Sequence, residues 1–235
     1  MDWSYSMIEL TAELVALFGR LDACAVSNAV ETFDRRLRNE GFADTSIRGL
    51  FQDLPPALGR AVTARIHCSA PPPIGRQYYD RTDWWSYILT VPPPRIVVVE
   101  DADERPGLGA FVGEVHANIL KALGCVAFAT NGSVRDVPAV RATGLQCLAS
   151  RVSVSHAYVH IVEFGQPVTI GGLTVASGDV LYGDGHGLVN IPEDLVEQIP
   201  SVVDRMRDVD RQLIALCHSS QFSLETLRRS LRPHQ

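Results

Sequence analysis

The apolar positions along the chain recur with two different spacings, which predict a mixture of helices and strands. Residues 7–18 carry leucine and phenylalanine side chains at helical spacing, and residues 27–38 predict a second helix with Ser27 as its N-cap. Residues 95–100 form an apolar run that is typical of a buried strand. The next two elements are predicted to be a helix and a strand, over residues 113–124 and 125–130.

The flanking segments extend this pattern. Further strands are expected where apolar residues alternate or lie between glycine turns, at residues 61–66, 145–149 and within 167–192. Short helices are expected to begin at Thr82 or Asp83 and at Asp136 or Val137. The sequence Asn131-Gly132-Ser133 predicts a turn.

The last part of the chain is amphipathic. Residues 193–218 carry apolar side chains at helical spacing, and Pro200 is expected to interrupt this helix. We therefore predict a single α/β domain over residues 1–192, followed by a helical extension over residues 193–235.

Composition narrows the class of protein. The net charge of −6 argues against a nucleic-acid-binding protein, which normally presents a basic face. No apolar run approaches the about 20 residues that span a bilayer, and residues 1–4 lack the basic flank of a signal peptide. The five cysteines are scattered without a CxxC pair, and we interpret them as reduced, mostly buried thiols. These features predict a cytoplasmic protein with no membrane or nucleic-acid partner.

Lys121 is the only lysine of the chain. Chemistry that needs a lysine nucleophile, such as imine formation, would therefore have to use this residue. No Gly-Lys pair occurs, which excludes a phosphate-binding loop of the GxxxxGK[ST] type. Because Lys121 lies well along the helix predicted over 113–124, we expect it to face solvent.

Two loops contain the polar residues that best suit chemistry. Gly113 and Glu114 come after the strand over 95–100, and Arg135 and Asp136 come after the next strand. Because the carboxyl ends of parallel strands meet at one edge of a sheet, we expect the two loops to lie side by side. An arginine can hold a carboxylate through two hydrogen bonds, an aspartate can bind a hard cation, and a glutamate can orient or deprotonate a water. The simpler alternative is a surface Arg–Asp pair beside a glutamate that the helix dipole favours.

Two other patterns give weaker signals. Gly107, Gly109 and Gly113 form a GxGxxxG sequence, but a six-residue polar loop separates it from the preceding strand, whereas a dinucleotide-binding fingerprint needs a tight turn. His156 and His160 have an HxxxH spacing that on a helix could bind zinc. Their surroundings favour a strand or loop, and in a strand they would lie about 13 Å apart. We therefore interpret them as structural histidines or as residues that support a binding site.

Several segments, in the right order, resemble the RraA-like family. Gly113-Glu114 followed, after twenty residues, by Arg135-Asp136 resembles the [D/E]-x20-R-D active-site motif of that family. The other resembling segments are Ser27 to Ala29, Asn131 to Asp136, Gly171 to Asp179 and Asp184 to Pro192. The family includes class II 4-hydroxy-4-methyl-2-oxoglutarate/4-carboxy-4-hydroxy-2-oxoadipate aldolases and the regulators of ribonuclease E activity. The resemblance implies a swivelling β/β/α fold, assembled as homo-trimers or hexamers with active sites between subunits.

The resemblance also implies roles for individual residues. Asp136 would bind Mg²⁺ or Mn²⁺, together with an acidic residue from the C-terminal helix of a neighbouring subunit, by position Asp210. Glu114 and Arg135 would be catalytic, with Glu114 positioning a water and Arg135 binding the carboxylate of a 2-oxo acid. The substrate-binding residues implied are Gly113, Val115, His116 and Arg135.

The implied activity is that of a divalent-metal-dependent lyase. It would cleave a 4-hydroxy-2-oxo diacid to pyruvate, or decarboxylate oxaloacetate, through a metal-stabilised enolate. The alternative is a non-catalytic, protein-binding regulator that resembles the ribonuclease E inhibitors, although those members usually depart from the Arg-Asp pair that this chain keeps. The chain itself departs from the family pattern at Asn131, in the aromatic segment with Tyr78, Tyr79, Trp84 and Trp85, and at His156 to His160. These departures leave the identity of the 2-oxo acid open.

Overall fold

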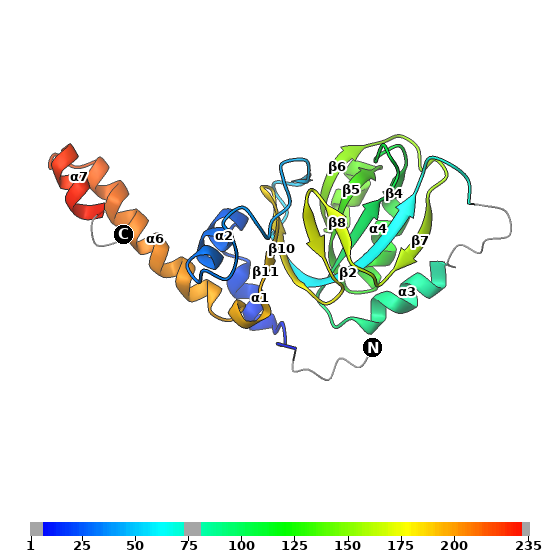
Figure 1. Cartoon of the computed structure of the whole chain (residues 1–235), viewed down its shortest axis with the longest axis horizontal. Helices are drawn as coiled ribbons and strands as arrows, with labels where there is room; N and C mark the ends of the chain where they lie inside the picture. Colours follow the sequence, from blue (N-terminus) through cyan, green and yellow to red (C-terminus); the bar gives the residue numbers. More distant parts are fainter. Residues whose placement is uncertain (1–6, 73–80, 232–235) are drawn as a thin grey trace.

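The computed structural model describes residues 7–72 and 81–231, so Tyr78 and Tyr79 lie outside the described residues. Within these ranges a nine-stranded mixed sheet has the order β1-β6-β5-β3-β2-β10-β11, with β4 beside β5 and β7 beside β2 (Figure 1). The strands of this sheet are β1 (Arg48–Gly49), β2 (Ala57–His67), β3 (Arg95–Asp101), β4 (Ala110–Val112), β5 (Cys125–Val134), β6 (Gln146–Val152), β7 (His160–Phe164), β10 (Val180–Asp184) and β11 (Gly187–Ile191). A separate hairpin pairs β8 (Val168–Ile170) with β9 (Leu173–Val175).

The long strand β2 bends the sheet into a nearly closed, swivelling-barrel arrangement. It pairs in parallel with β3 along most of its length, whereas its opposite edge pairs antiparallel with β10 at one end and with β7 at the other. Both faces of β3 are buried: Ile96 and Val98 belong to one hydrophobic cluster, and Val97 and Val99 to another. Burial on both faces explains the continuous apolar run over residues 95–100. The predicted mixed α/β class and swivelling fold are confirmed.

Helices cover the sheet on different sides. They are α1 (Ala12–Phe18), α2 (Ala23–Glu31), α3 (Arg81–Thr90), α4 (Glu114–Ala122), α5 (Val137–Ala142), α6 (Ile199–Cys217) and α7 (Leu224–Leu231). Helices α1 and α2 and the start of α6 pack with β10 and β11 around one core, whereas α3 and α4 pack against the other side of the barrel. The strand–helix–strand unit of β3, α4 and β5 thereby brings the two predicted loops to one edge.

Two predicted details of the helices are wrong. The second helix begins at Ala23, because Asp22 rather than Ser27 caps it, with the Asp22 carboxylate accepting the amide hydrogen of Ala25 at 2.8 Å. Pro200 does not interrupt the C-terminal helix. It occupies the first turn of α6, where a backbone N–H has no partner within the helix and proline is therefore tolerated.

The turn predicted at Asn131-Gly132-Ser133 is also wrong, because these residues continue β5 to Val134. The Asn131 side chain explains the difference. Its amide oxygen accepts the N–H of Asp101 at 2.7 Å, and its amide nitrogen donates to the Asp101 carbonyl at 3.0 Å. These two bonds take the place of the backbone hydrogen bonds between β3 and β5 where β3 ends. Asn131, which has a strong turn preference, is thereby held in a strand.

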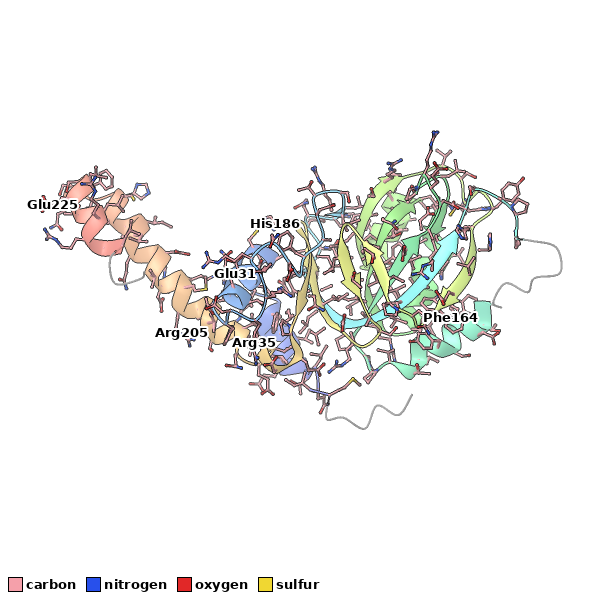
Figure 2. All side chains as sticks on the ribbon, in the orientation of Figure 1. Glu31, Arg35, Phe164, His186, Arg205 and Glu225 are labelled. Carbon is pink, nitrogen blue, oxygen red and sulfur yellow. The ribbon has the colours of Figure 1, made fainter. Side chains whose placement is uncertain are left out.

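The C-terminal helices extend away from the barrel (Figure 1). Ile199, Val202 and Val203 at the start of α6 are buried, whereas the later turns and α7 project outward, as the side chains of Arg205 and Glu225 show (Figure 2). The boundary between a domain over 1–192 and an extension over 193–235 remains a prediction. In the part of the chain that the structure describes, no helix combines the length and apolar character needed to cross a membrane.

Candidate functional site

Glu114, Arg135 and Asp136 line one cavity of about 820 Å³. The expectation that the two loops lie side by side is therefore confirmed. Strand β4 links them, because the amide of Arg135 donates to the carbonyl of Val112 at 3.0 Å, directly before the helix that Glu114 begins. The cavity lining also includes Trp85, Phe111, Gly113, Val115, His116, His156, Tyr158 and His160.

Gly113 allows the two loops to approach closely. A β-carbon at this position would lie 2.5 Å from Oδ2 of Asp136 and 3.0 Å from Nε of Arg135. Gly113 has an extended conformation, with φ −130° and ψ −167°, so its backbone does not require glycine. Close approach is thus the reason that the sequence has glycine before Glu114.

Asp136 lies between Glu114 and Arg135 and has an unusual backbone conformation. It has φ 52° and ψ 37°, the left-handed region that residues other than glycine, asparagine and aspartate seldom adopt. Its Oδ2 accepts the amide hydrogen of Glu114 at 3.2 Å and lies 3.5 Å from Nε of Arg135. The side chains of Arg135 and Asp136 are 38% and 41% exposed, so both remain accessible to a ligand in the cavity.

The oxygen donors of this cavity fit a hard divalent cation. Among the described residues, no hydrogen bond or ion pair engages the carboxylate of Glu114, and only Oδ2 of Asp136 is engaged. Mg²⁺ characteristically binds one or two protein carboxylates and keeps several waters. Two carboxylates at an open cavity match that pattern, and the adjacent Arg135 suits the carboxylate of an acid substrate.

The remaining predicted residues divide into two groups. Val115 and His116 line the cavity in the first turn of α4, where backbone amides have no acceptor within the helix and can bind an anionic group. Nδ1 of His116 donates to the carbonyl of Phe111 at 3.1 Å, which fixes its ring. Asp210 lies exposed on α6 and is not among the described cavity residues. Its predicted role requires a neighbouring subunit, so it remains a prediction.

Lys121 is also absent from the described cavity lining. Its Nζ lies 3.4 Å from the carbonyl oxygen of Gly144 at the surface. Lys121 thus lies about two turns along α4 from Glu114, and its ammonium group meets the Gly144 carbonyl rather than the described cavity.

Residues of the 156–161 segment line the same cavity, which the sequence did not reveal. Residues 156–159 form a loop before β7, and His156 donates from Nδ1 to the carbonyl of Ala157 at 2.8 Å. The prediction that His156 and His160 lie in a strand or loop is confirmed. In the sequence, this segment is distinguished only by its departure from the family pattern.

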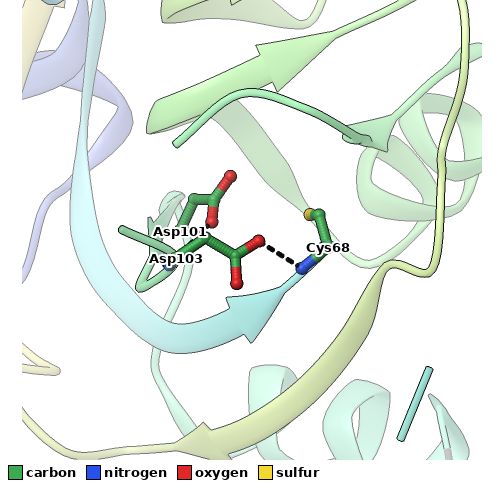
Figure 3. Close-up of side chains that lie close together, drawn as sticks. All are labelled: Cys68, Asp101 and Asp103. Atoms are coloured by element: carbon green, nitrogen blue, oxygen red, sulfur yellow. Dashed lines mark hydrogen bonds between the residues drawn. The ribbon is translucent and has the colours of Figure 1, made fainter. Parts of the chain in front are cut away.

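A second group of polar residues, Cys68, Asp101 and Asp103, lies at the ends of β2 and β3 (Figure 3). Their ligand atoms lie within 4.8 Å of one another, a composition that is compatible with a divalent metal. Hydrogen bonds already engage both carboxylates. Asp103 accepts the amides of Cys68 and Ser69, each at 2.8 Å, and Asp101 accepts the amide of Gly107 at 2.7 Å. These bonds fix the loop that follows β3.

The protonation of this group follows from its surroundings. Burial raises the pKa of the Cys68 thiol to about 12, and burial also raises the pKa of Asp101. For Asp103, burial favours a higher pKa, but hydrogen bonds from Ser69, Cys68 and His67 outweigh it and lower the pKa. Mg²⁺ and Mn²⁺ prefer oxygen ligands to a thiol, and both carboxylates of this group already accept hydrogen bonds from the protein. The Glu114–Asp136 cavity is therefore the better candidate for these cations.

Gly107 and Gly109 allow neighbouring segments to pack closely. A β-carbon on Gly109 would lie 2.5 Å from the carbonyl oxygen of His156, and one on Gly107 would lie 2.8 Å from Cδ of Arg151. The glycines therefore let neighbouring segments lie against the loop after β3.

Comparison with known proteins agrees with this geometry. The profile of the RraA-like family, described as Aldolase/RraA, matches residues 23–190. The chain belongs to the RraA-like family. Its fold is similar to that of an uncharacterized protein from Pseudomonas syringae pv. tomato, with a TM-score of 0.73, 18% identity, and coverage of 98% of this chain and 99% of that one.

Two further similar proteins carry names that point to different activities. The Streptomyces coelicolor protein RraAS2, described as an unusual member of the RNase ES inhibitor RraA protein family, has a TM-score of 0.64 and 21% identity, and the match covers 89% of this chain and 98% of that one. A Halalkalibacterium halodurans protein named "Putative 4-hydroxy-4-methyl-2-oxoglutarate aldolase" is 28% identical over 108 residues. That match spans 45% of this chain and 50% of the relative.

Proposed function

We propose that this protein is a divalent-metal-dependent carbon–carbon lyase that acts on a 2-oxo acid and releases pyruvate. The observation that carries the proposal is the convergence of Glu114, Arg135 and Asp136 on one cavity of an RraA-like chain. The similarity to the Halalkalibacterium halodurans protein named "Putative 4-hydroxy-4-methyl-2-oxoglutarate aldolase" supports the same chemistry. Retro-aldol cleavage of a 4-hydroxy-2-oxo acid and decarboxylation of oxaloacetate are the two reactions expected of this site.

Each residue has a distinct task in this reaction. Arg135 binds the carboxylate of the 2-oxo acid through its guanidinium group, and the amides of Val115 and His116 approach the same end of the substrate. Asp136 holds the cation, with Asp210 of a neighbouring subunit as a proposed second ligand. When bound, Mg²⁺ or Mn²⁺ supplies a Lewis acid that stabilises negative charge on the 2-oxo group.

Glu114 is positioned for proton transfer. In a retro-aldol reaction the 4-hydroxyl group loses its proton as the C3–C4 bond breaks, and C3 of the pyruvoyl fragment later gains a proton. Glu114, directly or through one water, accepts the first proton and can return it to C3. Its carboxylate lies at the cavity, so it can perform both transfers without a change of fold.

The test is pyruvate release from oxaloacetate and from 4-hydroxy-4-methyl-2-oxoglutarate, with Mn²⁺ or with EDTA. A protein-free blank containing the same Mn²⁺ corrects for decarboxylation by the free cation. Arg135→Ala and Asp136→Ala should each lower kcat/KM by about 100-fold or more, since each removes a charge that acts on the reacting group. Arg141→Ala is the matched control, because Arg141 pairs with Asp53 at the surface and does not line the cavity. Full activity in EDTA-treated protein would refute the metal-dependent mechanism.

The same preparation distinguishes the regulatory alternative. If no 2-oxo acid is turned over and the protein instead binds a ribonuclease tightly in a pull-down, the site belongs to a non-catalytic regulator. Sedimentation analysis of the same sample tests whether the chain forms the trimer or hexamer that an interfacial site requires.

A further inference from the structure

The cavity is larger than a pyruvoyl group needs. Its volume of about 820 Å³ lies in the range of pockets that hold drug-sized ligands. The Arg135–Asp136 pair and the start of α4 form only part of the lining. The remaining lining residues are available to contact the distal half of the substrate, the group attached to the pyruvoyl end. The chemistry of these residues therefore indicates which substrates fit.

That second part is a wall of rings and aliphatic side chains. We define the ring wall by its members Trp85, Phe111, Tyr158, Val159, His160 and Ile161. Phe111 is supported from behind by Phe128, with ring centroids 6.1 Å apart and an interplanar angle of 22°. A flat apolar group gains stabilisation on such a surface through burial and ring contacts.

The loop that carries Tyr158 is held in place before any ligand binds. The amide of Tyr158 donates to the carbonyl of Cys68 at 3.2 Å, and the amide of Ala110 donates to the carbonyl of Ser155 at 2.9 Å. Ala157 has φ 46°, an uncommon conformation for alanine that turns the chain between His156 and Tyr158. A wall fixed in advance loses less conformational entropy on binding.

Permanent positive charge is scarce around the cavity. Of the described lining residues, only Arg135 is an arginine or lysine, and the proposed function assigns it to the carboxylate at the pyruvoyl end. Glu114 and Asp136 add two carboxylates to the same lining. Of the described residues, the ring wall offers a second carboxylate the imidazole of His160 but no arginine or lysine, and its other members are rings and aliphatic side chains that suit an uncharged group.

We propose that the distal half of the substrate is an uncharged aromatic group, so that the substrate class is a 4-aryl-4-hydroxy-2-oxo acid rather than the diacid that the family resemblance suggests. This inference rests on the proposed function and refines it. In the reaction, the electron pair of the C3–C4 bond moves to C3, the hydroxyl proton leaves and C4 becomes a carbonyl. C3 then gains a proton, which gives pyruvate and an aromatic aldehyde without an oxidant or reductant.

The test compares 4-hydroxy-2-oxo-4-phenylbutanoate with 4-hydroxy-4-methyl-2-oxoglutarate in the Mn²⁺-loaded protein. Pyruvate release is measured for both, and oxaloacetate, whose C4 carboxylate stands in place of the distal group and which has no ring, is the ring-free reference. The phenyl substrate should have a kcat/KM at least tenfold above that of the diacid, a difference typical of pocket complementarity. An equal or higher value for the diacid overturns the inference while leaving the proposed function intact. Failure to turn over any of the three acids overturns both.

Variants of the ring wall separate binding from a general loss of structure. Tyr158 is 57% exposed, so Tyr158→Ala should leave the fold intact while lowering kcat/KM for the phenyl substrate about tenfold. Oxaloacetate decarboxylation should change less than about twofold. Leu89→Ala is the control, because Leu89 is 56% exposed on the same helix as Trp85 and does not line the cavity. Equal losses for the phenyl substrate and oxaloacetate in Tyr158→Ala would overturn the assignment of this wall.

Discussion

Gly113 and Asp136 approach each other so closely that a β-carbon on the glycine would lie 2.5 Å from Oδ2 of the aspartate. Gly113→Ala should therefore separate the start of α4 from the Arg135–Asp136 pair and break the bond from the Glu114 amide to Asp136. We expect kcat/KM for pyruvate release to fall about 100-fold, since small displacements of catalytic groups have large effects on rate. Steady-state kinetics with saturating Mn²⁺ measure this loss.

A second glycine supplies the control for this substitution. Gly19 has φ −58°, and a β-carbon there would approach the carbonyl oxygen of Ala16 no closer than 3.4 Å. Gly19→Ala should thus keep full activity. Wild-type kinetics in Gly113→Ala would show that the contact between the two loops is not needed for activity.

Lys121 provides a test of the class of aldolase. Because its Nζ lies at the carbonyl of Gly144 and outside the described cavity lining, it is poorly placed to form an imine with a substrate. We expect sodium borohydride plus substrate to leave activity unchanged, EDTA to abolish it, and Lys121→Arg to retain it within about twofold. Mass spectrometry of the borohydride-treated protein checks this directly, and a pyruvate adduct on Lys121 would contradict the metal-dependent mechanism.

The central part of the fold could be predicted because local and long-range signals agree there. The apolar run at residues 95–100 is buried on both faces, and the spacing of Glu114 and Arg135 follows from one strand–helix–strand unit. Asn131 shows the opposite case. Its turn preference is outweighed by two hydrogen bonds to the backbone of Asp101, a residue thirty positions earlier in the chain.

The far side of the cavity could not be predicted for a related reason. His156 and Tyr158 reach the site only because β7 pairs with the end of β2 and the preceding loop bonds to Cys68. That pairing is antiparallel and joins residues 93 to 100 positions apart, so periodicity along the sequence contains no trace of it. In the sequence, His156 and Tyr158 are therefore marked only by the departure of their segment from the family pattern.

The thiols should divide sharply by accessibility. Cys68, Cys125 and Cys147 are buried, and burial raises the pKa of each to about 12. Cys24 and Cys217 are exposed. We expect Cys217 to react rapidly with Ellman's reagent at pH 8 in the native protein, Cys24 more slowly, and all five thiols after denaturation. Partial burial and the carboxylates of Asp22 and Asp184 raise the pKa of Cys24, so less of it is the reactive thiolate. Rapid modification of Cys68 in the folded protein, located by peptide mapping, would contradict the arrangement at the end of β2.

Acid should weaken the attachment of the N-terminal segment to the barrel. Arg60 is 2% exposed and bonds Glu193 through both terminal nitrogens, at 2.7 and 3.1 Å, while Glu193 also accepts the amide of Ile8 at 2.7 Å. Burial favours a higher pKa for Glu193, but these bonds outweigh it and lower the pKa below 4.5. A carboxyl with a lowered pKa stabilises the fold above about pH 4.5, and this contribution is lost as the pH falls through the lowered value.

Glu193→Gln isolates that contribution, because it leaves the buried Arg60 without a negative partner. In urea unfolding at pH 7, the free energy of unfolding of the variant should be about 2 kcal/mol below that of the wild type. This is less than the usual effect of breaking a buried ion pair, because Arg60 keeps its bonds to the carbonyls of Gly178 and Ile8. Below pH 4.5 the wild-type free energy of unfolding should fall more steeply than that of the variant, so that the two curves converge. Glu225→Gln removes a fully surface pair with Arg229 and should change stability by less than about 0.5 kcal/mol. Parallel pH profiles for wild type and Glu193→Gln would show that this ion pair does not link acid to unfolding.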